Sequence, residues 1–223
     1  MNMLPLRLKN IVLFLNTKPF IKELQLVSNV YIVGGCVRDG FLDKNIKDID
    51  LIVEGLPMEQ IKSILKKYGK VDIVGQSFAV IKFSTEGFTE AIDIAVPRID
   101  KKIGTGHKGF KVITDGVNII EDLKRRDFTI NSIAVNIATK EIVDPFNGLE
   151  DLKNGLIKAT NPKAFIEDPL RILRGIQFAS RFSFAIDYDT LELMKQNAHL
   201  IKEISGERIL EEFKIQNSIN FNN

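Results

Sequence analysis

The sequence predicts an α+β fold, in which a mixed sheet of about five strands is followed by a helical part. Short apolar or alternating runs, which are typical of strands, concentrate before residue 140. From Pro162 onward, apolar residues recur at helical spacing instead, and the change falls near residues 140–160. We therefore expect a first domain over residues 1–147 and a helical domain over residues 148–223.

Each strand is expected to be short. The five strands are expected at residues 30–33, 49–53, 71–74, 79–83 and 89–95. Helical spacing of apolar residues predicts helices at 58–68, 169–181, 189–197 and 205–216. Residues 5–27 predict one or two short helices, the second beginning at Pro19, and residues 128–138 are expected to begin as helix and end as strand.

The composition is that of an ordinary globular protein, with 44% hydrophobic and 27% charged residues among 223. A net charge of +2 does not indicate a general nucleic-acid binder, so any RNA contact must come from a local basic patch. The best candidate is the glycine-rich segment 97–109, which is expected to be a flexible loop. Its basic side chains include Arg98, Lys101, Lys102 and Lys108.

Two glycines and two acidic residues form the most informative stretch of the chain. Gly34 and Gly35 end an apolar strand, and Asp48 and Asp50 follow a short expected helix. Carboxylates at i and i+2 of a strand share one face, and such a pair stays ionised most easily when it holds a cation such as Mg²⁺. A diglycine backbone lets a phosphate approach closely, next to a helix N-terminus. The pattern indicates a metal-dependent enzyme of nucleoside triphosphates, although an acidic pair that caps a turn is the alternative.

Further motifs occur in a fixed order after this first one. They are Arg125-Arg126-Asp127-Phe128-Thr129-Ile130-Asn131, Asp144-Pro145-Phe146-Asn147-Gly148 with Asp151-Leu152, Glu167-Asp168-Pro169-Leu170-Arg171-Ile172-Leu173-Arg174, and Ser205-Gly206-Glu207-Arg208-Ile209. In this order, the five motifs resemble those of the class II tRNA nucleotidyltransferases, which include the bacterial CCA-adding enzymes and poly(A) polymerases. The resemblance covers nearly the whole chain from residue 31 onward.

This resemblance implies a polymerase-β-like nucleotidyltransferase head followed by a helical neck. The implied reaction is the Mg²⁺-dependent, template-independent addition of CMP and AMP, from CTP and ATP, to the tRNA 3′ end, with release of pyrophosphate. Asp48 and Asp50 are the expected metal ligands. Asp93 is expected as a third catalytic carboxylate, because the superfamily uses one from a neighbouring strand; a structural aspartate is the alternative.

The resemblance also implies which residues hold the nucleotide. Gly34, Gly35, Arg38 and Arg126 match positions near the triphosphate. Arg38 has the alternative of a structural ion pair with Asp39 or Asp43, and the Arg125-Arg126 pair the alternative of a solvated basic pair. Adjacent residues do not share a helix face, so we expect one of these two arginines to face the scaffold.

Asp168, Arg171 and Arg174 are expected to lie on one side of a helix, at i, i+3 and i+6. An aspartate accepts and an arginine donates hydrogen bonds, so Asp168 and Arg171 can select cytosine and adenine by the base edge, supported by Arg174. A network of salt bridges is the alternative. The next position on this face is Gln177, an uncharged residue that can form hydrogen bonds, where the family usually has arginine.

The expected partners are the tRNA 3′ end, CTP and ATP. Family members are usually considerably longer, so the chain is a fragment, a short enzyme or half of a split system in which a second chain supplies tRNA-binding helices. An enzyme that adds only A or only CC, and a non-catalytic nucleotide- or RNA-binding module, are the alternative functions. The apolar run at 11–15 is too short to span a membrane, and a cytoplasmic location is expected.

Overall fold

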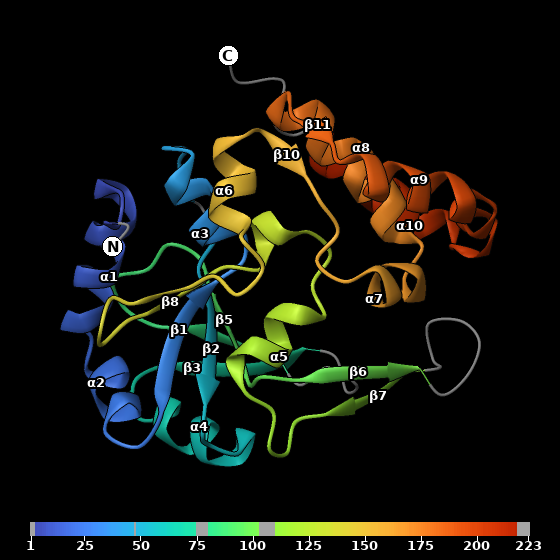
Figure 1. Ribbon diagram of the computed structural model, residues 1–223. Coiled ribbons are helices and arrows are strands. Elements are labelled where there is room, and N and C mark those ends of the chain that lie inside the picture. Colours follow the sequence, from blue (N-terminus) through green and yellow to red (C-terminus); the bar gives the residue numbers. More distant parts are fainter. Residues whose placement is uncertain (1–2, 47, 75–79, 103–109, 218–223) are drawn as a thin grey trace.

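Seven strands form one mixed sheet in the part of the chain that the computed structural model describes, residues 3–46, 48–74, 80–102 and 110–217 (Figure 1). Their order is β3-β4-β5-β2-β1-β8-β9, and within this sheet only β2 and β5 are parallel neighbours. The strands are β1 (Asn29–Val33), β2 (Asp50–Glu54), β3 (Lys70–Val74), β4 (Val80–Ser84), β5 (Ile92–Ala95), β8 (Ala134–Asn136) and β9 (Ile142–Val143). The α+β class is confirmed.

All five expected strands lie in this sheet. The segment that was expected to begin as helix and end as strand forms a 3₁₀ turn, Thr129–Asn131, and then β8. The sheet is therefore wider than the expected five strands. β9 was not expected, since a strand of two residues carries too little pattern to be recognised.

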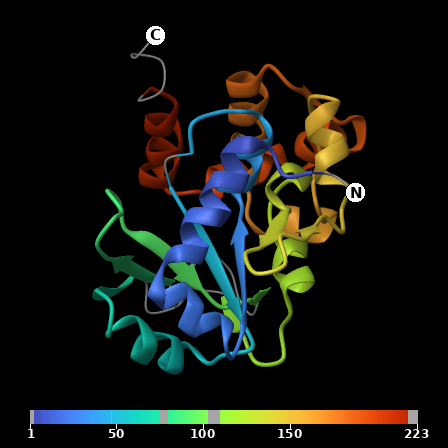
Figure 2. The same ribbon diagram turned by 90° about the vertical axis from the view of Figure 1, so that its left-hand side faces the viewer.

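Helices cover both faces of the sheet. On one face lie α1 (Leu6–Thr17), α2 (Pro19–Gln25) and α4 (Met58–Leu65), and Figure 2 shows α1 and α2 across the strands. On the other face lies α5 (Ile119–Lys124). Side chains of a strand alternate between faces, so Val30 and Ile32 pack toward α1 and α2, whereas Tyr31 and Val33 pack with α5.

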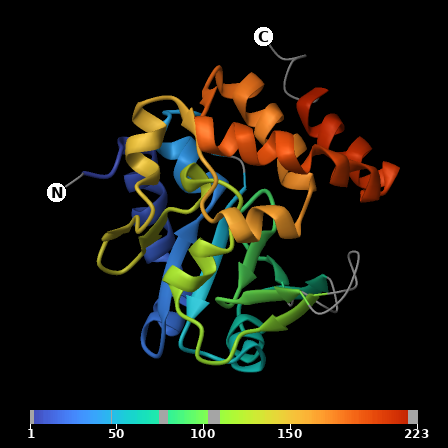
Figure 3. The same ribbon diagram turned by 45° about the vertical axis from the view of Figure 1, so that its right-hand side comes forward.

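The helical part follows the sheet and lies beside one end of it (Figure 3). Its elements are α6 (Gly148–Lys153), β10 (Leu156–Ile157), α7 (Pro162–Glu167), α8 (Leu170–Phe182), β11 (Ala185–Ile186), α9 (Tyr188–Asn197), a 3₁₀ helix (Ala198–Glu203) and α10 (Gly206–Asn217). None of the helices in the described ranges is both long enough and apolar enough to cross a membrane.

One hydrophobic core continues from the sheet into the helical part. Phe128, which precedes the 3₁₀ turn, is fully buried, and its ring lies 5.7 Å from that of Phe165 and 5.8 Å from that of Phe178. Edge-to-face aromatic pairs of this kind add to the stability that their burial supplies. Because the core is continuous, the division into domains at residues 147 and 148 stays a prediction.

The segment 97–109 is not simply the loop that its glycines predicted. β6 (Ile99–Lys102) pairs with β7 (Phe110–Ile113) as an antiparallel hairpin, with Ile99 opposite Ile113 (Figure 1). The expectation of a loop is wrong for residues 99–102, because cross-strand pairing outweighed the local composition. Arg98 lies 3.3 Å from the Asp100 carboxylate and is largely buried, while residues 103–109, which include Lys108, lie outside the described residues.

Gly148 begins α6 where that helix touches the 3₁₀ turn. A Cβ at this position would lie 2.2 Å from the Thr129 carbonyl oxygen, which is backbone and cannot turn aside. The Asp144 carboxylate accepts hydrogen bonds from the backbone N–H groups of Gly148 and Leu149, at 2.7 and 3.0 Å. The motif at 144–148 therefore fixes α6 against the segment that carries Asp127 and Asn131.

Replacing Gly148 with alanine should lower the free energy of unfolding by about 1–3 kcal/mol, because the new methyl group would push the two backbone segments apart. Urea denaturation followed by circular dichroism measures the change. Gly206→Ala is the matched control, since a Cβ there meets no atom within 4 Å. Equal unfolding midpoints for the two variants would contradict the close contact.

Candidate active site

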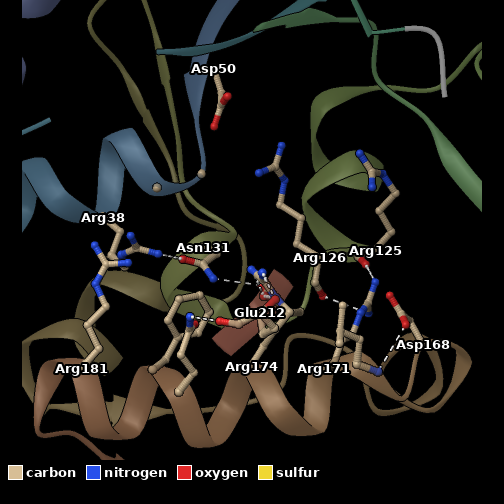
Figure 4. A pocket seen from close by; sticks show the side chains of 16 residues that line it. Arg38, Asp50, Arg125, Arg126, Asn131, Asp168, Arg171, Arg174, Arg181 and Glu212 are labelled. Atoms are coloured by element: carbon tan, nitrogen blue, oxygen red, sulfur yellow. Dashed lines mark hydrogen bonds and ion pairs between the residues drawn. The ribbon is translucent and has the colours of Figure 1, made fainter. Parts of the chain in front are cut away.

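A cavity of about 530 Å³ opens between the starts of β2 and of α3 (Gly35–Phe41) and the helices α8 and α10 (Figure 4). Six arginines and four carboxylates line it, so arginine charge exceeds carboxylate charge. They are Arg38, Arg125, Arg126, Arg171, Arg174 and Arg181, with Asp50, Asp127, Asp168 and Glu212. Such a cavity is suited to an anion that also carries groups able to pair with carboxylates.

Gly34 brings the first two motifs into contact. Its backbone has φ +71°, a conformation that other residues rarely adopt. A Cβ there would lie 3.0 Å from Nη1 of Arg126 and 3.6 Å from Oδ2 of Asp50. The structure therefore places the glycine, the carboxylate and the arginine side by side, although they are far apart in the sequence.

Two of the three predicted catalytic carboxylates are neighbours across the sheet. Asp50 on β2 and Asp93 on β5 are register partners in the parallel pair. Asp48 is exposed and precedes β2, so the expectation that it lies on the strand is wrong. Burial raises the pKa of Asp50, and repulsion from Asp93 and Asp48 raises it further, against the opposing effect of Arg126.

Lys82 on β4 binds Asp93, with Nζ 3.0 Å from Oδ1. Among the described residues, no group of three or more histidine, cysteine, aspartate or glutamate side chains is arranged around a common metal position. The donor set nevertheless fits a hard cation in kind, since Asp50 and Asp93 supply carboxylate oxygens from adjacent strands. Asp50 also has no hydrogen-bonded partner among the described residues, so its carboxylate oxygens are available to a cation.

Arg38 forms an ion pair with Asp39, which was one of the alternatives to nucleotide binding. Its guanidinium lies 2.8 Å from the Asp39 carboxylate and donates to the Asn131 side chain at 2.7 Å. Burial lowers the pKa of Arg38, although Asp39 opposes this effect. The guanidinium still borders the cavity, so contact with a nucleotide stays a prediction.

Asp122 on α5 was not recognised from the sequence, and it holds both arginines of the second motif. It is fully buried, and its two oxygens lie 2.7 Å from Arg125 Nη2 and 3.0 Å from Arg126 Nη2. Burial alone would raise the pKa of Asp122, but the two guanidinium groups outweigh it and lower that pKa. The signal was present, since Asp122 precedes the pair by three and four residues, which is helical contact spacing.

Asp127 ties this segment to α8. It accepts hydrogen bonds from the Asn131 amide at 3.0 Å and from Arg174 at 2.8 Å. Burial would raise the pKa of Asp127, but Arg174 and Asn131 outweigh that effect and lower the pKa to about 2. The hydrogen bond from Asn131 to Asp127 spans i and i+4 and holds the second motif in place.

The three predicted base-selecting residues line the cavity, but not as one helix face. Asp168 precedes α8 in an extended conformation, because Pro169 disfavours helical geometry in the residue before it. Its carboxylate lies 3.3 Å from Arg208 of α10. Arg171 donates to the carbonyl oxygen of Arg125 at 2.6 Å, and Arg174 pairs with Asp127. Part of the alternative salt-bridge network is therefore present.

α10 contributes residues that the sequence did not single out for the site. Glu212 is buried, with Oε2 3.6 Å from Arg174 Nη1. Gln177 is also buried and donates to the backbone carbonyl of Glu212 at 3.2 Å, so it joins α8 to α10. The packing of α10 on α8 joins segments far apart in the chain, and local patterns do not predict such contacts.

Comparisons with known proteins agree with this geometry. Residues 30–158 match the family described as "Poly A polymerase head domain", and residues 183–214 match "Probable RNA and SrmB- binding site of polymerase A". The "CCA-adding enzyme" of Lactobacillus helveticus is 35% identical over 215 residues, which are 90% of this chain and 49% of that protein.

Solved structures show the same fold. The structure titled "The complex structure of CCA-adding enzyme with ATP" has a TM-score of 0.74 at 31% identity, covering 95% of this chain and 47% of that one. The Thermotoga maritima CCA-adding enzyme complexed with tRNA-CCA has a TM-score of 0.71 at 33% identity, covering 92% and 46%. The chain thus spans about half the length of these relatives. By its motifs, its cavity and these matches, the chain belongs to the poly A polymerase head-domain family, the nucleotidyltransferases that include the CCA-adding enzymes.

Proposed function

We propose that this chain carries the catalytic centre of a template-independent RNA nucleotidyltransferase. It adds CMP and AMP, from CTP and ATP, to the 3′ end of tRNA and releases pyrophosphate. The observation that carries the proposal is that the side chains of Asp50 and Arg126 both border the space that a Cβ on Gly34 would fill, because a carboxylate and an arginine there can act on one phosphate group. Similarity over most of the chain to enzymes solved with ATP and with tRNA supports it.

Mg²⁺ is the proposed cation, with Asp48 and Asp50 as its ligands and Asp93, the neighbour of Asp50 across the sheet, as the third carboxylate. A bound divalent ion would supply charge neutralisation to the phosphate oxygens and orient the reacting groups. A contribution from Asp93 requires that Lys82 release its carboxylate, and because both side chains are partly exposed, little buried contact is lost.

The residues of this chain position the reactants rather than form bonds with them. In the reaction, the tRNA 3′ oxygen bonds to the α-phosphorus as the bond to pyrophosphate breaks, and the hydroxyl proton passes to solvent water. Arg126 lies where it can neutralise phosphate charge beside Asp50, while the Gly34-Gly35 backbone leaves room for that phosphate. Correct placement of two reactants can account for a large part of a rate enhancement.

Asp168 and Arg171 are the proposed selectors of the base. Cytosine and adenine both offer an exocyclic amine and a ring acceptor, whereas uracil and guanine reverse that order, so one acceptor and one donor can discriminate. On binding, the Asp168 carboxylate would leave Arg208 and accept a hydrogen bond from the base amine. Arg171 would leave the backbone carbonyl oxygen of Arg125 and donate to the ring nitrogen of the base. Arg174 supports them through Asp127.

Addition of only A or only CC is the alternative activity, and a non-catalytic nucleotide- or RNA-binding module is the alternative of another class. Relatives twice as long leave room for tRNA-binding helices beyond these residues, supplied by further chain or by a second chain. A cytoplasmic location, where tRNA and triphosphates occur, stays a prediction.

Primer extension with Mg²⁺ tests the proposal. The purified protein is given tRNAs that end at the discriminator base, at C and at CC, each with one of the four triphosphates. Addition of C, C and then A is expected, and Asp50→Asn should slow it at least a hundredfold, because a ligand charge is lost. Asp72→Asn, a change of an exposed carboxylate on β3, is the matched control.

Extension of only some primers would identify the partial-specificity enzyme. No extension of any primer, while CTP and ATP still raise the melting temperature, would favour the binding module. Full activity of the Asp50→Asn protein would overturn the metal assignment.

Asp168→Ala should reduce the preference for CTP over UTP by roughly 10- to 100-fold, because a charged hydrogen bond to the base amine is lost. Single-nucleotide incorporation from each triphosphate, measured as kcat/KM, gives this ratio. Glu167→Ala is the matched control, since Glu167 is the neighbouring acid and does not line the cavity. An unchanged CTP/UTP ratio in Asp168→Ala would remove Asp168 from base selection.

A further inference from the structure

Arg181 is a basic residue of the cavity that no motif includes. It lies near the end of α8, one helical turn beyond Gln177, and its guanidinium points toward that of Arg38 (Figure 4). Across the described part of the chain, no carboxylate lies within ion-pair distance of Arg181. Its contact is with the face of the neighbouring Phe182 ring, 5.1 Å from the guanidinium carbon. A guanidinium that borders a cavity without a carboxylate is available to a bound anion.

Positive charge accumulates at this end of the cavity. Among the described residues, Arg38 has one carboxylate within ion-pair distance, that of Asp39. The guanidinium carbon of Arg38 lies 4.9 Å from the centre of the Phe182 ring. Lys44 lies over the same ring at 5.0 Å. Burial lowers the pKa of Arg38, and repulsion from Arg181 adds to that effect. Three cations therefore gather around Phe182 while Asp39 balances only one of them.

The diglycine connects this cationic end with the acidic end. A Cβ on Gly35 would lie 3.4 Å from Nη2 of Arg38, just as one on Gly34 would meet Arg126 and Asp50. The order along the cavity wall is thus Asp50 with Arg126, the two glycines, Arg38 and then Arg181 (Figure 4). A chain of phosphates that followed this wall from Asp50 would bring its far members to Arg38 and Arg181.

We propose that Arg181 binds the terminal phosphates of the incoming triphosphate, and therefore also the pyrophosphate that leaves. The inference rests on the proposed function and deepens it. Gln177 cannot serve in this way, because it is uncharged and its amide is bonded to the backbone of α10. Arg181 follows Gln177 by four residues on the same helix face and carries the positive charge that Gln177 lacks.

Calorimetric titration with inorganic tripolyphosphate and, separately, with CMP tests the inference. Arg181→Gln should weaken tripolyphosphate binding about tenfold or more and leave CMP binding unchanged, since only the terminal phosphates lose a partner. Arg181→Lys should retain part of the affinity, because it keeps the charge without the fork geometry. Arg7→Gln, a change of an exposed arginine paired with Asp43, is the matched control. Thermal melting confirms that each variant is folded.

Equal tripolyphosphate affinities of the wild type and Arg181→Gln would overturn the inference, as would a wild type that binds no tripolyphosphate. An equal loss of CMP and tripolyphosphate affinity would also overturn it, because that result means general damage to the cavity. Primer extension is measured separately. If the wild type extends primers but Arg181→Gln binds tripolyphosphate normally, only the role of Arg181 is wrong. If Arg181→Gln selectively loses tripolyphosphate binding but the wild type extends no primer, the proposed activity is wrong and the anion site stands.

Discussion

The candidate site depends on one buried carboxylate. Asp122 receives Arg125 on one oxygen and Arg126 on the other, and it also accepts the backbone N–H of Arg98 at the start of the hairpin. The carbonyl of Arg125 in turn accepts Arg171 of α8. Loss of one partner from a buried ion pair costs about 3–5 kcal/mol, so Asp122 fixes the arginines in place as well as neutralising them.

Most other charged side chains of the cavity are also held by a partner of opposite charge. Asp127 holds Arg174, Asp39 holds Arg38, and Arg208 holds Asp168, so the side chains expected to bind a nucleotide are already oriented by the protein. Preorganised charges of this kind favour binding because less ordering is required when the ligand arrives. There are two exceptions in the described part of the chain, where Asp50 lacks a hydrogen-bonded partner and Arg181 lacks a carboxylate within ion-pair distance. They lie toward opposite ends of the diglycine, and they mark where a cation and an anion are expected.

Much of this arrangement was predictable, because it follows from local signals. The alternating strands predicted the sheet, whereas the grouping of Gly34, Asp50 and Arg126 at one nucleotide was implied by the resemblance of the motifs to the family. Asp168 was misplaced by helical spacing, since Pro169 moves the helix start beyond it. The hairpin at 99–113 was missed because glycine and lysine content hid a cross-strand pairing. Glu212 and Arg208 depend on how α10 packs on α8, and that contact joins segments too far apart for pattern to indicate.

The central claim is that Arg126, which Asp122 orients together with Arg125, binds phosphate in a nucleotide site. The most direct measurement is the calorimetric affinity for CTP with Mg²⁺ of the wild type and of Asp122→Asn, an isosteric change, at a temperature where both are folded. The account predicts at least tenfold weaker binding in the variant, because Arg125 and Arg126 lose the carboxylate that positions them. Equal affinities in two folded proteins would contradict it.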